Sequence, residues 1–186
     1  MRFFRIARSH GAHRTDGCAS PIAFPLKYTR DRMIDRGNFQ RFPDIAGDDD
    51  EDTTLLRELA QEARRYIAGH TWCPPEKNLW LACGVGGVVA LFLVEFSQKI
   101  AGSPDDTLWL VVGDLPSAYF VTENATTPRD ALECYCNMME EWITAVLDGG
   151  DLEEVYPVEA EPNEQNAQEL ESRLEFLRAE IIPAIT

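Results

Sequence analysis

Apolar residues recur at helical spacing in three stretches of the chain. The first lies between Thr53 and Gly69, where the intervals match one face of a 3.6-residue repeat. Asp52 or Thr53 can cap the start of this helix, and Gly69 stands where a helix C-terminus is expected. The pattern predicts an amphipathic helix of about four turns, with its apolar face formed by Leu55, Leu56, Leu59, Ala63, Tyr66 and Ile67.

Two further helices are predicted in the C-terminal third. Thr127 can cap the second helix, Pro128 suits its first position, and Asp130 favours the positive end of the helix dipole. Gly149 and Gly150 end it. The third helix is predicted to begin at Pro162-Asn163 and to stop at Pro183, with a stripe formed by Ala167, Leu170, Leu174, Leu177 and Ile181.

Four apolar runs between the first and second helices predict strands, at residues 79–83, 88–96, 107–112 and 117–122. The run from Val88 to Val94 shows no alternation, which is typical of a central strand covered on both faces. Short connections favour antiparallel neighbours. The expected fold class is therefore α+β, with a mostly antiparallel four-stranded meander and three amphipathic helices packed on it.

Glycine and proline mark the connections between these strands. Gly84–Gly87 reads as a turn or a glycine-bulged bend, and Gly113–Pro116 as a second turn. The stretch 79–96 is apolar enough to raise the question of a membrane helix, since about 20 residues span a bilayer. Its glycines and its strand-forming residues favour two strands instead.

Charge divides the chain into two parts. Residues 1–41 hold nine basic and three acidic residues, a net of +6, whereas residues 42–186 hold eight basic and 29 acidic residues, a net of −21. We expect residues 1–52 to form a basic, disordered tail followed by an acidic linker at Asp48–Asp52, and residues 53–186 to form one domain. An alternative for the first part is a reading frame that begins too early, with the true start at Met33.

The net negative charge of the chain argues against several classes of partner. With 32 acidic against 17 basic residues and a net charge of −15, the chain should repel nucleic acid and anionic membranes. The chain has five cysteines, an odd number without disulfide-type spacing, which is typical of a reducing compartment. We therefore expect a cytoplasmic protein.

Candidate catalytic groups are few. His70 is the one histidine of the predicted domain, and no hydrolase, phosphate-loop or zinc-protease motif is present. His70 and Cys73 with Cys134 and Cys136 do not form a convincing zinc set, because Cys134 and Cys136 point to different sides of a helix. The sequence predicts no catalytic residue, no metal and no cofactor.

One segment resembles a motif of other proteins. The stretch Leu108-Trp-Leu-Val-Val-Gly-Asp-Leu-Pro-Ser117 resembles a strand and turn, W-x-x-x-G-D-L-P, of small uncharacterised bacterial proteins that share a domain of unknown function. The resemblance implies a bacterial, single-domain protein and carries no activity. In this region Trp109, Asp114 and Tyr119 are candidate binding residues, together with His70. Asp114 has two open interpretations, as a turn-forming side chain or as a functional carboxylate.

Two functions follow as hypotheses. The first is a protein-interaction module, similar to an immunity protein or an inhibitor, that binds a basic protein partner. The alternative is a small-molecule-binding or enzymatic domain with its site near the Gly84–Gly87 bend and the Gly113–Pro116 turn. A co-purifying protein would favour the first, and a deep apolar pocket with convergent polar groups the second.

Overall fold

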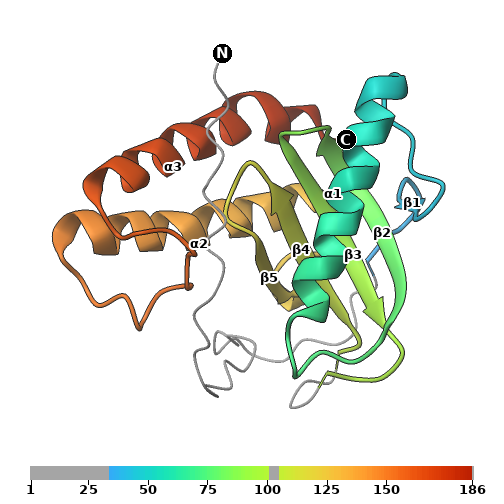
Figure 1. Ribbon diagram of the computed structural model, residues 1–186, viewed down its shortest axis with the longest axis horizontal. Coiled ribbons are helices and arrows are strands. Elements are labelled where there is room, and N and C mark those ends of the chain that lie inside the picture. The colour runs from blue at the N-terminus through green and yellow to red at the C-terminus, as the bar shows by residue number, and fades with distance from the viewer. Residues whose placement is uncertain (1–33, 101–104, 186) are drawn as a thin grey trace.

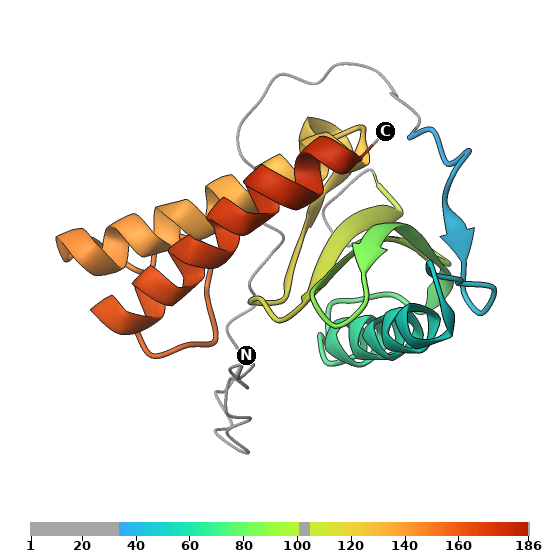
Figure 2. The same ribbon diagram turned by 90° about the horizontal axis from the view of Figure 1, so that it is seen from above.

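The computed structural model describes residues 34–100 and 105–185 of the chain. Its fold is α+β, a five-stranded antiparallel meander with three helices packed against it, as the sequence predicts apart from the number of strands. Helix α1 (Asp50–Ala68) covers one face of the sheet, and α2 (Pro128–Asp148) and α3 (Glu164–Phe176) lie together on the other (Figures 1 and 2).

Each strand of the sheet pairs with the next one along the chain. The strands are β1 (Gln40–Arg41), β2 (Glu76–Val85), β3 (Val89–Phe96), β4 (Thr107–Gly113) and β5 (Ala118–Val121). The stretch 79–96 is thus a β-hairpin, and within the described residues no helix is long and apolar enough to cross a membrane. The additional strand, β1, has two residues and no apolar period, so the sequence pattern gave no sign of it.

The central strand β3 separates two hydrophobic cores. All eight of its residues are buried, which confirms the expectation of a strand covered on both faces. Leu91 and Leu93 face the core under α2 and α3, and Phe92 and Val94 face the core under α1. Since successive side chains of a strand point to opposite faces, one uninterrupted apolar run supplies both cores.

Helix α1 begins within the acidic run that the sequence predicted as a linker. The Asp49 side chain accepts a hydrogen bond from the backbone N–H of Asp52 at 2.8 Å and caps the helix, which starts at Asp50. Three acidic residues therefore occupy its first turn, where the helix dipole favours negative charge. Helix α2 is capped at both ends. The Thr127 side chain accepts a hydrogen bond from the backbone N–H of Asp130, and Gly149 ends the helix with a φ of 68°.

The structured part of the chain begins before the boundary predicted at residue 53. Ile45 has no exposed surface, and the Phe39 ring lies 6.0 Å from that of Trp109. Arg36 forms an ion pair with Glu95 at 3.2 Å. These residues belong to the domain because the cores bury their apolar side chains. Residues 1–33 of the tail and linker predicted for residues 1–52 lie outside the described residues.

Candidate functional site

Trp109, a candidate binding residue from the sequence, lies in the core. Its side chain has no exposed surface, and its indole N–H donates to the carbonyl oxygen of Ala125 at 2.6 Å. A buried ring with its one polar atom satisfied offers nothing to a ligand at the surface. Its role here is packing.

Asp114 is held by an ion pair between the turn and α3. Its carboxylate accepts from Nη2 of Arg173 at 3.1 Å, and its backbone carbonyl accepts from Nε of the same arginine at 2.9 Å. Both side chains are about 30% exposed, at 31% for Asp114 and 27% for Arg173. The guanidinium of Arg173 therefore neutralises the charge of Asp114. This geometry favours the structural interpretation of Asp114.

The two glycine-containing bends lie against each other and leave little space. The N–H of Asp114 donates to the carbonyl oxygen of Val88 at 2.9 Å. A Cβ atom on Gly113 would overlap that same carbonyl, and one on Gly86 would come within 2.6 Å of a carboxylate oxygen of Asp52. Gly86 and Gly113 are thus required because neighbouring atoms pack closely against them.

His70 and Tyr119, the other two candidates, do come together. They belong to a group of five rings at the β5 edge of the sheet, here called the edge cluster, which consists of Tyr66, His70, Trp72, Tyr119 and Tyr156. The ring centroid of Tyr119 lies 5.0 Å from that of His70 and 4.9 Å from that of Trp72. All of these rings except Tyr156 are partly exposed. The edge cluster therefore forms an aromatic surface.

A chain of hydrogen bonds fixes the rings of the edge cluster. The backbone N–H of Tyr119 donates to the Tyr156 hydroxyl at 3.1 Å, and the Tyr66 hydroxyl donates to the carbonyl oxygen of Ser117 at 3.0 Å. The two hydroxyl oxygens lie 3.4 Å apart. Burial raises the pKa of both Tyr66 and Tyr156 above the ordinary value, so both hydroxyls keep their protons at neutral pH. Nδ1 of His70 lies 3.0 Å from the carbonyl oxygen of Tyr66.

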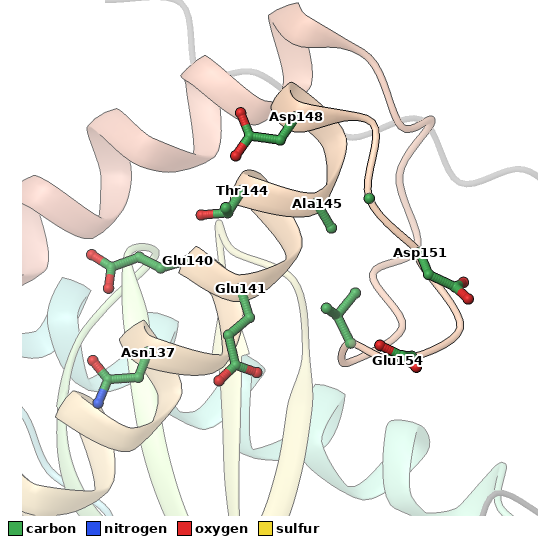
Figure 3. Close-up of a pocket in the computed structure, with 10 residues that line it drawn as sticks. Asn137, Glu140, Glu141, Thr144, Ala145, Asp148, Asp151 and Glu154 are labelled. Atoms are coloured by element: carbon green, nitrogen blue, oxygen red, sulfur yellow. The ribbon is translucent and has the colours of Figure 1, made fainter.

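A second feature is a groove of about 630 Å³ between the C-terminal half of α2 and the loop that follows it (Figure 3). We call it the acidic groove. Five carboxylates line it, three from α2 and two from the loop, and its lining contains no lysine, arginine or histidine. The acidic residues are Glu140, Glu141, Asp148, Asp151 and Glu154.

Only one of these carboxylates is neutralised by a neighbour in the described part of the chain. Arg178 forms ion pairs with Glu140 and with Glu133, the latter at 3.2 Å, and its Nη2 also donates to Asn137 at 2.9 Å. The hydrogen bond with Glu140 is the main reason that the pKa of Arg178 is raised. No ion pair within the described residues involves the other four acids of the groove. Their charge faces solvent.

The grouping of the acidic side chains in this groove was not predicted from the sequence. The part of the groove on α2 does follow a sequence pattern. Four of its residues have the spacing of one helix face, namely Asn137, Glu141, Thr144 and Asp148. The loop acids carry no such period, and their position across from α2 follows from the return of the chain toward Tyr156. The edge cluster is likewise assembled from segments far apart in the sequence.

Burial keeps the thiols of Cys83 and Cys136 protonated. Cys136 is buried, and burial raises its pKa to about 12 and that of Cys83 to about 12. Such thiols are poor nucleophiles and metal ligands. In residues 34–100 and 105–185 no group of three or more histidine, cysteine, aspartate or glutamate side chains is arranged to hold a metal ion.

Comparison of the chain with protein-family models, with curated proteins and with solved structures gives no match. The resemblance of the segment around Trp109 to small bacterial proteins therefore stays a prediction.

Proposed function

We propose that the protein is an interaction module, similar to an immunity protein or an inhibitor, that binds a basic segment of a partner protein in the acidic groove. The observation that carries the proposal is the lining of the groove, which contains five carboxylates and no basic side chain. A partner with lysine or arginine side chains would supply the missing charge, and complementary charge favours both encounter and orientation.

The charges around the groove support the proposal. Residues 128–185 contain 15 acidic and three basic residues. Each of the three basic residues already has partners, since Arg173 pairs with Asp114, Arg178 pairs with Glu133 and Glu140, and Arg129 donates to backbone carbonyls. The helical layer is therefore strongly negative. Such a field repels nucleic acid and anionic lipid and attracts a cationic protein.

The alternative function, a small-molecule or enzymatic site at the glycine bends, has less support. Backbone atoms of Val88 and the side chain of Asp52 occupy the space beside Gly113 and Gly86. Arg173 also neutralises Asp114, the one carboxylate of the Gly113–Pro116 turn. A ligand at this place would have to displace packed groups.

The experiment neutralises the groove without changing its shape. The variant Glu141→Gln/Asp151→Asn/Glu154→Gln removes three charges, and the control variant Glu171→Gln/Glu175→Gln/Glu180→Gln removes three exposed charges from α3 and the turn after it. Binding of an eight-residue lysine peptide is measured by calorimetry at several salt concentrations. We expect the groove variant to bind at least about tenfold more weakly than the control, with a smaller dependence on salt. Equal affinity of the two variants would reject the acidic groove as the binding site.

A further inference from the structure

We infer that Arg178 is an internal counter-ion of the acidic groove: it holds Glu140 in an ion pair and directs the basic side chains of a partner to the other carboxylates of the groove. This inference rests on the proposed function and deepens it, because it states which carboxylates a basic segment uses and what limits its affinity. Arg178 acts through Glu140, so it is a positioning residue of the site.

Arg178 lies in a widened helical turn that follows α3. This turn, Leu177–Ile181, has π-helical hydrogen bonding, a rare geometry that is frequent at functional sites. Leu177 and Ile182 are buried in the core under α2 and α3, and they anchor the backbone on both sides of the arginine. The Arg178 side chain itself stays at the surface, where it is 34% exposed. Its guanidinium is therefore presented to α2 from a fixed backbone.

The guanidinium of Arg178 bonds to three residues on one face of α2. Nε donates to Glu133 at 3.2 Å, and Nη2 donates to Asn137 at 2.9 Å. Glu140 is held by both carboxylate oxygens, one accepting from Nη1 and the other from Nη2 at 3.1 Å. The three residues of α2 are four and three positions apart, which places them one above the other. Such a bidentate pair is stronger and more directional than a single contact.

The partners of Arg178 overlap with the lining of the acidic groove. Asn137 and Glu140 belong to both. Glu140 and Glu141 leave α2 in different directions, and only the first is paired with Arg178 (Figure 3). The groove thus has one neutralised carboxylate and four that form no ion pair in the described part of the chain. These four are Glu141, Asp148, Asp151 and Glu154.

A cation from outside competes with Arg178 for Glu140 on unequal terms. Arg178 is part of the same chain, so its guanidinium has an effective concentration that a free partner does not reach. A lysine of the partner also offers one ammonium group in place of a planar fork. The partner therefore gains more from the four unpaired carboxylates. Removing Arg178 should open Glu140 as a fifth.

The test measures the binding of the eight-residue lysine peptide to the full chain by calorimetry. Arg178→Gln removes the internal cation. Arg129→Gln is the matched control, because it removes the same charge from the same helical layer and loosens the same C-terminal segment, where Arg129 donates to the carbonyl oxygens of Pro183 and Ile185. We expect Arg178→Gln to raise the affinity about three- to fivefold, the factor that corresponds to one partly exposed ion pair. Arg129→Gln should raise it less than about twofold.

A second comparison shows whether the gain comes from Glu140. In the Glu140→Gln background, Arg178→Gln should raise the affinity no more than Arg129→Gln does, because the carboxylate that it would release is already neutral. A general effect of charge or of loosened structure would not depend on this background. Thermal unfolding confirms that each variant is folded.

A measurement on the unaltered chain needs no variant. The ion pair between Arg178 and Glu140 should stay intact when the peptide binds. In an NMR titration we therefore expect the Nε–H resonance of Arg178 to stay nearly in place while the backbone amide resonances of Asp151 and Glu154 shift.

The outcomes separate this inference from the function on which it rests. If the peptide binds the unaltered chain and Arg178→Gln raises the affinity no more than Arg129→Gln, the inference fails and the proposed function stands. An equal gain in the Glu140→Gln background would also overturn it, as would a shift of the Arg178 resonance as large as those of the groove amides. If the peptide binds neither the unaltered chain nor Arg178→Gln, both the proposed function and the inference fail.

Discussion

The Tyr156 hydroxyl accepts a hydrogen bond from the backbone N–H of Tyr119, with 3.1 Å between the oxygen and the nitrogen. Tyr119 lies on β5, the last strand of the sheet, and Tyr156 lies in the connection between α2 and α3. A loop side chain thus satisfies a backbone group that would otherwise be available to another strand. Covering an edge in this way limits edge-to-edge association.

Tyr156→Phe should lower the free energy of unfolding by about 1–2 kcal/mol, because it leaves a partly buried N–H without an acceptor. Urea unfolding measures the change. Tyr66→Phe should cost a similar amount through the loss of its bond to Ser117, and the double variant should cost less than the sum, since the two hydroxyls are neighbours. Full additivity would show that the hydroxyls act independently.

Glu95 should make the protein sensitive to acid. Glu95 is 9% exposed, and its carboxylate accepts hydrogen bonds from Lys77 at 2.6 Å and from Asn78 at 2.9 Å. The bond from Lys77, helped by Asn78 and the charge of Arg36, lowers the pKa of Glu95 from 4.5 to about 2, against the opposing effect of burial. A pKa lowered in the folded state stabilises the fold above the unfolded value, so this contribution is lost as the pH falls from about 4.5 to about 2.

Glu95→Gln tests that contribution. We expect it to lower the free energy of unfolding by about 2–3 kcal/mol at pH 7 and to flatten the fall in stability between pH 4.5 and pH 2. Unfolding by urea across this pH range provides the measurement. A variant that loses stability with the same slope as the unaltered chain would show that other carboxylates control the acid response.

Two of the glycines with positive φ, Gly113 and Gly149, should respond differently to alanine. Gly113 has a φ of 147°, and an added Cβ would overlap backbone atoms of Val88, so Gly113→Ala should cost more than about 3 kcal/mol or prevent folding. Gly149 has a φ of 68° with no atom within 4 Å of the added Cβ, so Gly149→Ala should cost about 1 kcal/mol. Thermal unfolding compares the two, and equal losses would contradict the packing argument.

Asp114→Asn should leave the protein folded and its binding of basic peptides unchanged. Asparagine keeps a side-chain oxygen for Nη2 of Arg173, and partly exposed ion pairs contribute about 1 kcal/mol or less. The melting temperature and the affinity for the lysine peptide are the two readouts. Loss of binding with unchanged stability would restore Asp114 as a functional carboxylate.

Local signals allowed the larger elements to be predicted. The caps at Thr127 and Gly149 and the apolar run in β3 act within a few residues, and the structure confirms the elements that they indicated. Strand β1 escaped detection because its pairing with β2 depends on residues beyond α1, with Arg41 opposite Trp80. The capping role of Asp49 was hidden by its acidic neighbours, any of which can accept the same bond.

The candidate site could be predicted only in part, for the same reason. Helix periodicity places Glu141 and Asp148 on one face, but the position of Glu154 opposite them depends on the path of the loop. His70 and Tyr119 were singled out separately, and nothing in their sequence spacing indicates that their rings touch. Contacts between distant segments follow from tertiary packing, which a single sequence does not display.

The order of the strands affects how fast the domain folds and which strand pairings form first. The pairings β2–β3, β3–β4 and β4–β5 close comparatively short loops at small entropic cost. Folding rates rise as contacts become more local, and this part of the sheet can form as successive hairpins. The pairing of β1 with β2 must instead enclose the whole of α1. We therefore expect protection of the Phe42 amide, which donates to Leu79, to develop after protection of the amides in β3 and β4 when hydrogen exchange is followed during refolding.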